Sequence, residues 1–330
     1  MHNEPRTEGL QAAAAQPARV KVARRPLHGV LLLDKPLGLS SNQALQKAKW
    51  LLRAEKAGHT GTLDPAATGL LPLCFGAATK FSQVSLDADK VYEAQVRLGV
   101  TTDTGDAEGR VLRVTSVALD RSRLDAVLDR FRGEIDQVPP MHSALKHEGR
   151  PLYTYAREGV TLDRAPRRVR ILALEASWDP LAPEHMTLRV RCSKGTYIRT
   201  LAEDIGAALG CGASLTALRR LASGPLSVDR AITLEALERL DEPGRQACLL
   251  PADELLHDWP AIELEPSEAA RFITGLRRRV SQADCAAVRV YGPRVSQTTD
   301  RRPLLGSAHI RAGELIPDRL LSPPEIQAQA

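Results

Sequence analysis

The sequence predicts an α+β fold in which a mixed, largely antiparallel sheet is flanked by helices. Short apolar or alternating runs at residues 30–33, 92–98 and 188–192 are typical of strands. Apolar residues recur at helical spacing over residues 119–131 and 198–209. The expected core is therefore one sheet with helices packed against it.

The texture of the sequence changes twice along the chain. Residues 1–26 are rich in Ala, Arg and Gln, and are predicted to be a disordered basic tail. A large domain is expected over residues 27–250. Beyond it, short apolar runs alternate with Gly, Pro and Asp, which predicts a small β-rich domain over residues 251–330. Within that part, residues 251–266 are expected to be a connection and residues 304–310 a strand.

Composition points to a protein with a polyanionic partner in a reducing compartment. The net charge is +5 with a pI near 9.0, and aromatic residues are only 4%, so a bound nucleic acid would be recognised by shape and phosphate contacts more than by stacking. The five cysteines are scattered without a Cys-x-x-Cys pair, which argues against disulfides and zinc and favours the cytoplasm. The sequence contains no apolar run long enough to predict a membrane span.

The stretch around Asp64 is the strongest candidate for a functional loop. Residues 58–69 (GHTGTLDPAATG) hold three glycines and a proline around one carboxylate. Glycine lets a backbone turn sharply and approach a ligand, and Pro65 favours an extended or turn conformation for Asp64. A carboxylate held this rigidly is a candidate nucleophile or general base, but a surface turn in which Asp64 caps its neighbours explains the same residues. The stretch is not a Walker loop, because no Gly-Lys-Ser/Thr follows.

Residues 137–165 combine a Pro-Pro pair with basic residues and tyrosines. This pattern is typical of a mobile element that clamps RNA, and an ordinary irregular insertion is the alternative. Its histidines, His142 and His147, lack the glutamate of a His-Glu-x-x-His zinc motif. The loop with Asp103 and Asp106 does not match an EF-hand, so both are expected in turns, with Asp106 contacting RNA or orienting a basic side chain. No metal site is predicted.

The Asp64 loop belongs to a longer pattern. Residues 57–72 (AGHTGTLDPAATGLLP) closely resemble the catalytic motif of the TruB family, the bacterial tRNA pseudouridine-55 synthases. Further blocks match in family order over roughly residues 27–230: GVLLLDKP at 29–36, ATKF at 78–81, RLG at 97–99, TDTGD at 102–106, SALK at 143–146 and CSKGTYIRT at 192–200. Each block is short, but the ordered set is highly specific.

This resemblance implies an isomerase that converts uridine to pseudouridine at position 55 in the T-loop of tRNA, by flipping the base out of its stack. It implies a pseudouridine-synthase-like catalytic domain over residues 27–250 and a PUA-like RNA-binding domain over residues 251–330. The reaction leaves the oxidation state unchanged, so no cofactor is expected. The expected partner is the T-stem–loop of tRNA, with no obligate protein partner, and a monomer is the simplest expectation.

The resemblance assigns catalytic roles to Asp64, Tyr92 and Arg199. Asp64 would act on the sugar or the ring, and attack at C1′, addition to C6 and abstraction of the C2′ proton all stay open. Arg199 would pair with Asp64 in a bidentate contact that orients the carboxylate and keeps it ionised. Tyr92 would stack on the target base, and taking the proton in the closing steps is a further role open to it.

Substrate- or RNA-binding roles follow from the same resemblance for five further residues. His59 would fill the gap that the flipped nucleotide leaves. Tyr197 and Leu218 would form walls of the base pocket. Lys35 and Lys80 would support the site or contact phosphates.

The sequence departs from the family pattern at two positions. His142 stands where an aromatic residue is expected, and Glu93 places an acid beside Tyr92. The first affects the clamp contacts and the second the local potential. Because Asp64 and Arg199 are intact, an enzyme is favoured over the alternative, a non-catalytic RNA-binding or tRNA-folding protein.

Overall fold

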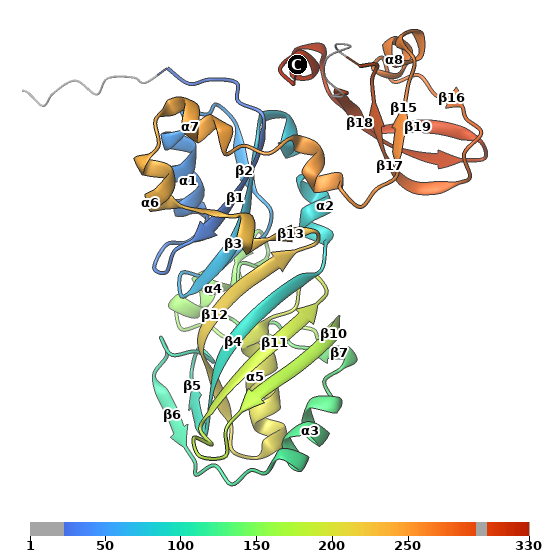
Figure 1. The fold of residues 1–330 in the computed structure, drawn as a ribbon. Coiled ribbons are helices and arrows are strands. Elements are labelled where there is room, and N and C mark those ends of the chain that lie inside the picture. Colours follow the sequence, from blue (N-terminus) through green and yellow to red (C-terminus); the bar gives the residue numbers. More distant parts are fainter. Residues whose placement is uncertain (1–22, 295–301, 330) are drawn as a thin grey trace, which may run out of the picture.

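The computed structural model describes residues 23–294 and 302–329. A 10-stranded sheet with helices forms the main body, and a five-stranded sheet forms a smaller body at the C-terminal end of the chain (Figure 1). The predicted α+β fold with a small C-terminal β-rich domain is confirmed. The N-terminal tail expected over residues 1–26 lies mostly outside the described residues.

The large sheet is mixed and mostly antiparallel. Its strands follow the order β14-β1-β3-β12-β4-β11-β10-β7, with β2 paired to β3 and β13 paired to β12. The pairs β1–β14 and β3–β12 are parallel. The strands are β1 (Gly29–Lys35), β2 (Ala57–His59), β3 (Ala67–Phe75), β4 (Lys90–Leu98), β7 (Gly133–Gln137), β10 (Arg167–Trp178), β11 (His185–Cys192), β12 (Ala213–Ser223), β13 (Leu226–Ser227) and β14 (Ile232–Thr233).

Strands β1 and β3 are buried on both faces, which explains their uninterrupted apolar sequences. One face packs against α1 (Ser41–Leu51) and α6 (Leu234–Arg239). The other face packs against the 3-10 helix η1 (Gly76–Phe81) and against Leu304 and Leu321 from the C-terminal part. This end of the sheet therefore joins the two bodies.

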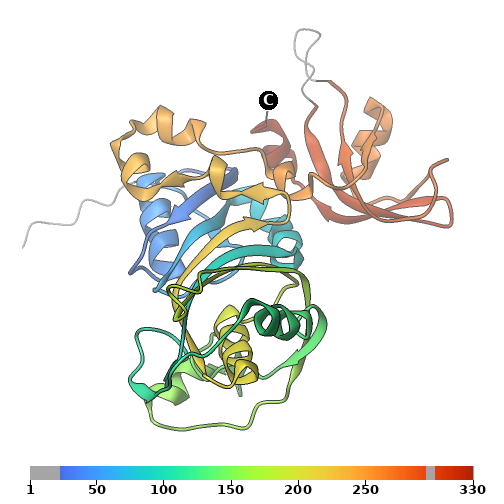
Figure 2. The same cartoon turned by 60° about the horizontal axis from the view of Figure 1, so that its bottom comes forward.

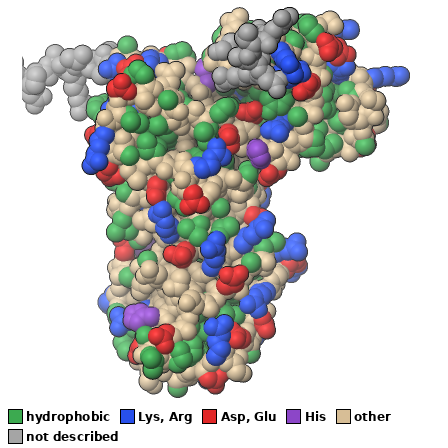
Figure 3. Space-filling model, viewed as in Figure 1, with side chains coloured by type: hydrophobic (Ala, Val, Ile, Leu, Met, Phe, Trp, Pro, Cys, Tyr) green, Lys and Arg blue, Asp and Glu red, His purple; other side chains and the backbone are tan. Residues whose placement is uncertain are grey.

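Buried and exposed residues alternate along strands β4, β11 and β10, because only one face of this part of the sheet is buried. Helices α3 (Arg121–Asp129) and α5 (Ile198–Leu209) lie together against the buried face (Figure 2). The opposite face exposes charged residues of both signs, among them Arg97, Arg189 and Glu93. Lys and Arg side chains are interspersed with Asp and Glu over the face seen in Figure 3, so this face forms no single positive field.

Helix α5 matches its predicted range of residues 198–209. Its apolar stripe is buried against β12 and β4. Gly210 ends it with a φ of +81°, the left-handed conformation typical of a helix C-terminus. The first turn of α5 points Arg199 away from the core cluster and toward the loop that carries Asp64.

The other helices are short. They are α2 (Ser82–Asp87), α4 (Leu152–Arg157), α7 (Glu242–Ala247), α8 (Pro266–Phe272), α9 (Pro323–Gln327), η2 (Val228–Arg230) and η3 (Ala252–Leu256). Two small hairpins stand apart from the sheets: β5 (Val100–Thr102) with β6 (Val111–Val114), and β8 (Lys146–His147) with β9 (Arg150–Pro151). Among the described residues, no helix is long and apolar enough to cross a membrane.

The smaller sheet has the order β15-β17-β18-β19-β16. Its strands are β15 (Ala261–Glu263), β16 (Arg278–Arg279), β17 (Cys285–Tyr291), β18 (Leu304–Arg311) and β19 (Glu314–Leu320). The strand expected at residues 304–310 is confirmed. The expectation that residues 251–266 only connect the domains is wrong, because they contain η3 and the edge strand β15.

Gly69 allows two strands of the large sheet to approach closely. Its φ is +99°, and a Cβ at this position would lie 2.3 Å from the carbonyl oxygen and 2.7 Å from the amide nitrogen of Arg220 on β12. Only glycine fits both the backbone conformation and the space. The parallel pairing of β3 with β12 therefore depends on this residue.

We predict that Gly69→Ala destabilises the protein more than Gly38→Ala. Gly38 also has a positive φ of +85°, but a Cβ at this position would meet no atom within 4 Å. Both substitutions carry a backbone cost of about 1–3 kcal/mol, and only Gly69→Ala adds a clash with a neighbouring strand. Denaturant unfolding of the two variants measures the difference. Equal losses of unfolding free energy would contradict the assigned role of Gly69.

Candidate active site

The loop that carries Asp64 is fixed by contacts along its whole length. It joins β2 to β3, and Asp64 accepts a backbone hydrogen bond from Ala67 through its carbonyl (3.0 Å). The Ser41 hydroxyl of α1 donates to the Leu63 carbonyl (3.0 Å) and accepts from the Leu63 amide (2.7 Å). The Asp64 side chain remains 51% exposed, so a rigid backbone presents a carboxylate that a substrate can reach.

Arg199 binds this carboxylate. Its side chain is only 8% exposed, and its Nη2 donates to Asp64 Oδ2 at 2.5 Å. Only one nitrogen of the guanidinium contacts Asp64, so the expected bidentate pair is not formed. The other donors of Arg199 are used by other acceptors. Nη2 also donates to the His142 carbonyl (3.2 Å), and Nη1 donates to the Thr104 carbonyl (3.1 Å). Arg199 Nε lies 3.3 Å from Asp106 Oδ2.

Asp106 orients Arg199 and is turned away from solvent. Its side chain is 15% exposed. Its Oδ1 accepts from the Thr104 hydroxyl (2.6 Å) and from the Glu108 amide (3.2 Å). The contact of Asp106 with Arg199 matches the role of orienting a basic side chain, and a contact with RNA stays a prediction.

Five of the nine predicted residues line one cavity of about 350 Å³: Asp64, Tyr92, Tyr197, Arg199 and Leu218. A second cavity of about 370 Å³ shares Asp64, Arg199, Leu215 and Leu218 with the first, and Asp106 also lines it. Asp64 therefore belongs to the lining of both cavities.

The two tyrosines of the first cavity come from different elements. Tyr92 lies on β4, and burial raises the pKa of its hydroxyl. Tyr197 directly precedes α5, and its amide and carbonyl are both bound by the side-chain amide of Gln137 on β7 (2.8 and 3.0 Å). Gln137 is buried, so it fixes where Tyr197 and the start of α5 lie.

The four other predicted residues, Asp106, Lys35, Lys80 and His59, do not line this cavity. Lys35 is fully buried, and its ammonium donates to the carbonyls of Pro36 (2.9 Å) and Leu39 (2.6 Å). Burial lowers the pKa of Lys35 to about 8. Lys80 donates to the Leu320 carbonyl (2.9 Å) and to Glu325 (2.5 Å), so it ties η1 to the C-terminal part of the chain. Both contacts match a supporting role, and contact of either lysine with a phosphate stays a prediction.

His59 lies at the end of β2, next to the loop of Asp64. Its Nδ1 is buried and has no hydrogen-bond partner among the described residues. Burial lowers the pKa of His59 below its ordinary value of 6.5. The side chain is therefore neutral at neutral pH.

Sequence reasoning missed two cations of this cavity. Lys90 lines it, and its ammonium donates to the carbonyls that end α2, at 2.6–3.0 Å. Burial lowers the pKa of Lys90 to about 8. Arg220 is 1% exposed and also lines the cavity. Neither position carries a local signal, because only the pairing of β4 with β12 brings them to Asp64.

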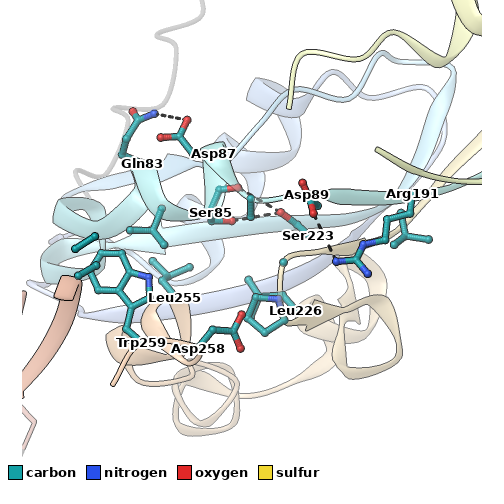
Figure 4. Close-up of a pocket in the computed structure, with 17 residues that line it drawn as sticks. Gln83, Ser85, Asp87, Asp89, Arg191, Ser223, Leu226, Leu255, Asp258 and Trp259 are labelled. Atoms are coloured by element: carbon teal, nitrogen blue, oxygen red, sulfur yellow. Dashed lines mark hydrogen bonds and ion pairs between the residues drawn. The ribbon is translucent and has the colours of Figure 1, made fainter. Parts of the chain in front are cut away.

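A larger cavity, of about 910 Å³, lies away from Asp64 between α2, β13 and the C-terminal part (Figure 4). Asp87, Asp89 and Asp258 border it, together with the apolar Leu226 and Trp259. Arg191 also lines it and is paired with Asp89 at 3.5 Å, so among its described lining residues the cavity offers a phosphate backbone no unpaired cation. The chemistry is therefore assigned to the cavities beside Asp64.

Comparison with known proteins agrees with this assignment. Residues 49–198 match the family described as TruB family pseudouridylate synthase (N terminal domain), and residues 199–257 match the tRNA pseudouridylate synthase B C-terminal domain. The chain belongs to the TruB family of pseudouridylate synthases. It is thus a pseudouridine synthase, and the catalytic interpretation is favoured over the non-catalytic alternative.

Relatives and solved structures extend the match over most of the chain. The tRNA pseudouridine synthase B of Verminephrobacter eiseniae is 60% identical, covering 94% of this chain and 93% of that protein. The enzyme of the same name from Cupriavidus pinatubonensis is 57% identical, covering 91% and 96%. The crystal structure of a Cbf5-Nop10-Gar1 complex is similar in fold, with 25% identity, a TM-score of 0.68 and coverage of 91% and 86%.

We predict a pH-dependent stability difference between the wild type and His59→Gln. In the unfolded chain the His59 pKa returns to near 6.5, while burial keeps it lower in the folded protein. The unfolded chain therefore binds more protons in this window, and folding stability falls as the pH drops from about 7 to about 5. The wild type should lose more unfolding free energy over that interval than His59→Gln, measured by denaturant titration at both pH values. The same loss in both proteins would show that His59 is not buried as described.

Proposed function

We propose that this protein isomerises uridine to pseudouridine at position 55, in the T-loop of tRNA. The observation that carries the proposal is the Asp64 carboxylate, held by the buried Arg199 in a cavity that Tyr92 also lines. Membership of the TruB family and the names of the relatives support the reaction and the RNA class.

The residues of the cavity supply what the reaction needs. Isomerisation breaks the N1–C1′ bond, turns the uracil and forms a C5–C1′ bond, with loss of the C5 hydrogen. An aspartate is ionised at neutral pH, so Asp64 needs no separate base to activate it. Arg199 holds the carboxylate through a charge-assisted hydrogen bond and so fixes the direction from which it approaches the nucleotide.

The size of the cavity requires the base to leave its stack. A volume of about 350 Å³ admits a single nucleotide and excludes a helix. In this proposal Tyr92 stacks on the extracted uracil, Tyr197 and Leu218 form the walls, and His59 fills the gap that the nucleotide leaves in the T-loop. These contacts offset the few kcal/mol that unstacking costs.

Residues 137–165 are positioned to clamp the RNA in this proposal. Ser143 and the two residues after it line the Asp64 cavity, and His142 contacts Arg199. Nearby, the guanidinium of Arg150 lies 4.6 Å from the ring centre of Tyr155, and the pair forms a basic and aromatic surface suited to RNA. The T-stem–loop is the expected partner, recognised by shape.

The proposal also covers the remaining parts of the chain. The PUA-like part, over residues 251–330, would bind the RNA away from the T-loop, and residues 27–250 would carry the chemistry. The protein would act as a monomer in the cytoplasm, without an obligate protein partner.

We predict that Asp64→Asn binds tRNA with an affinity close to the wild type but releases no tritium from tRNA labelled at uridine C5. The amide keeps the shape of the side chain and removes its charge. Tritium release and filter binding, measured together, separate chemistry from recognition. Release by the variant would contradict the role of Asp64, and binding without release by the wild type would favour the non-catalytic alternative.

We further predict that Asp106→Asn slows conversion and Asp103→Asn does not. Both residues lie in the same loop, but Asp106 contacts Arg199, whereas Asp103 pairs with the exposed Arg110 at 3.8 Å. Loss of the Asp106 charge should let Arg199 shift and lower the single-turnover rate by about 10- to 100-fold, since small misplacements of reacting groups have effects of this size. Equal rates for the two variants would remove Asp106 from the site.

A further inference from the structure

Arg220 is a buried cation without an anionic partner. Its side chain is 1% exposed, its Nε donates to the Leu70 carbonyl at 2.7 Å, and its Nη2 has no hydrogen-bond partner among the described residues. Within residues 23–294 and 302–329, no ion pair joins it to a carboxylate. A purely structural role, in which Arg220 binds the backbone of β3, explains the hydrogen bond of Nε. It does not explain why Nη2 is buried without a partner in the described part of the chain.

The sheet register directs Arg220 into the Asp64 cavity. Arg220 pairs with Tyr92 on β4 and with Gly69 on β3, and paired residues project to the same face of a sheet. Gly69 has no side chain and so lets the backbone of Arg220 approach β3 closely. At the other end, a Cβ on Gly61 would lie 3.3 Å from Arg220 Nη1, so the guanidinium runs beneath the loop of Asp64.

A buried and unpaired guanidinium is costly, and arginine cannot reduce the cost by losing its proton. Asp64 does not relieve it, because Asp64 is bound by Arg199. Such a group is expected where a ligand brings negative charge. The cavity therefore lacks an anion that its substrate can supply.

The proposed reaction develops that anion on the uracil whichever route Asp64 takes. If the N1–C1′ bond breaks, its electron pair stays on the uracil, and C1′ is attacked by Asp64 or C2′ loses a proton to it. If Asp64 adds to C6, the C5–C6 electron pair moves toward O4 as an enolate. In each case a uracil carbonyl oxygen gains negative charge.

We propose that Arg220 is a catalytic residue that donates a hydrogen bond from Nη2 to a uracil carbonyl oxygen as this charge develops. The inference rests on the proposed function. The base is the target because Arg220 lies beside Tyr92, the proposed stacking partner, and is almost inaccessible to solvent. A donor aimed at developing charge acts most strongly in such a water-excluded place.

The test compares two T-stem–loop substrates, one with uridine and one with 5-fluorouridine at the target position. Fluorine withdraws electrons and stabilises negative charge on the ring, so the reaction depends less on Arg220. Because fluorine cannot leave as the C5 hydrogen does, both reactions are followed by loss of the parent nucleoside, measured by mass spectrometry after digestion. Single-turnover rates are compared for the wild type, Arg220→Met and Arg220→Lys.

We expect Arg220→Met to slow the uridine reaction by about 100-fold, the usual effect of losing one such donor, while the affinity for RNA changes little. The defect should shrink several-fold with 5-fluorouridine, and Arg220→Lys should fall between Arg220→Met and the wild type. A partly misfolded variant would lower both rates equally, so the ratio of the two defects is independent of folding. Equal defects on the two substrates, or a wild-type rate in Arg220→Met, would overturn the inference.

Arg219→Met is the matched control. Arg219 is the preceding residue of β12, projects to the opposite face and is paired with Asp34 at 2.7 and 3.0 Å. It should convert both substrates at close to wild-type rates, and a substrate-dependent defect equal to that of Arg220→Met would contradict the inference. If the wild type itself converts no uridine, the proposed function fails. If the wild type is active and Arg220→Met is equally active, only the inference about Arg220 fails.

Discussion

The site depends on one buried guanidinium. Arg199 contacts the carboxylate of Asp64 in the loop between β2 and β3. It also contacts the Asp106 carboxylate and the Thr104 carbonyl in the loop after β5. Its fourth contact is the His142 carbonyl, in the segment proposed to clamp RNA. Unsatisfied donors on a buried arginine cost free energy, so the four contacts of Arg199 favour the fold in which these segments come together. The orientation of the Asp64 carboxylate is thereby determined before any substrate binds.

The charges around the cavity are unbalanced in a way that suits its chemistry. The register of the large sheet aligns Lys35, Gly69, Arg220 and Tyr92 across four neighbouring strands. Gly69 lets β12 approach β3 closely, and the guanidinium of Arg220 reaches the loop of Asp64, where a Cβ on Gly61 would lie 3.3 Å from its Nη1. Lys35 directs its ammonium to local carbonyls, whereas Arg220 retains an unused donor. The unused donor of Arg220 is the group that we propose to stabilise negative charge on the bound nucleotide.

Features that depend on a local pattern of residues could be predicted from the sequence. Features that depend on how distant strands pair could not. The range of α5 follows from its apolar spacing and from Gly210, and the glycines around Asp64 mark the loop. Arg220 carries no such signal, because its place depends on the parallel pairing of β12 with β3, whose partners are about 150 residues apart. The contact of Lys80 with Glu325, 245 residues away, is hidden for the same reason.

The most direct test of this account is the single-turnover rate of Arg199→Lys on a T-stem–loop RNA, with RNA affinity measured in parallel. Lysine keeps the charge and can reach Asp64, but its single nitrogen cannot also hold Asp106 and two carbonyls in the fixed geometry of a guanidinium. We expect conversion to fall by about 100-fold, because the carboxylate is no longer oriented, while the affinity changes little. A wild-type rate in Arg199→Lys would show that charge alone suffices and that the shared guanidinium does not organise the site.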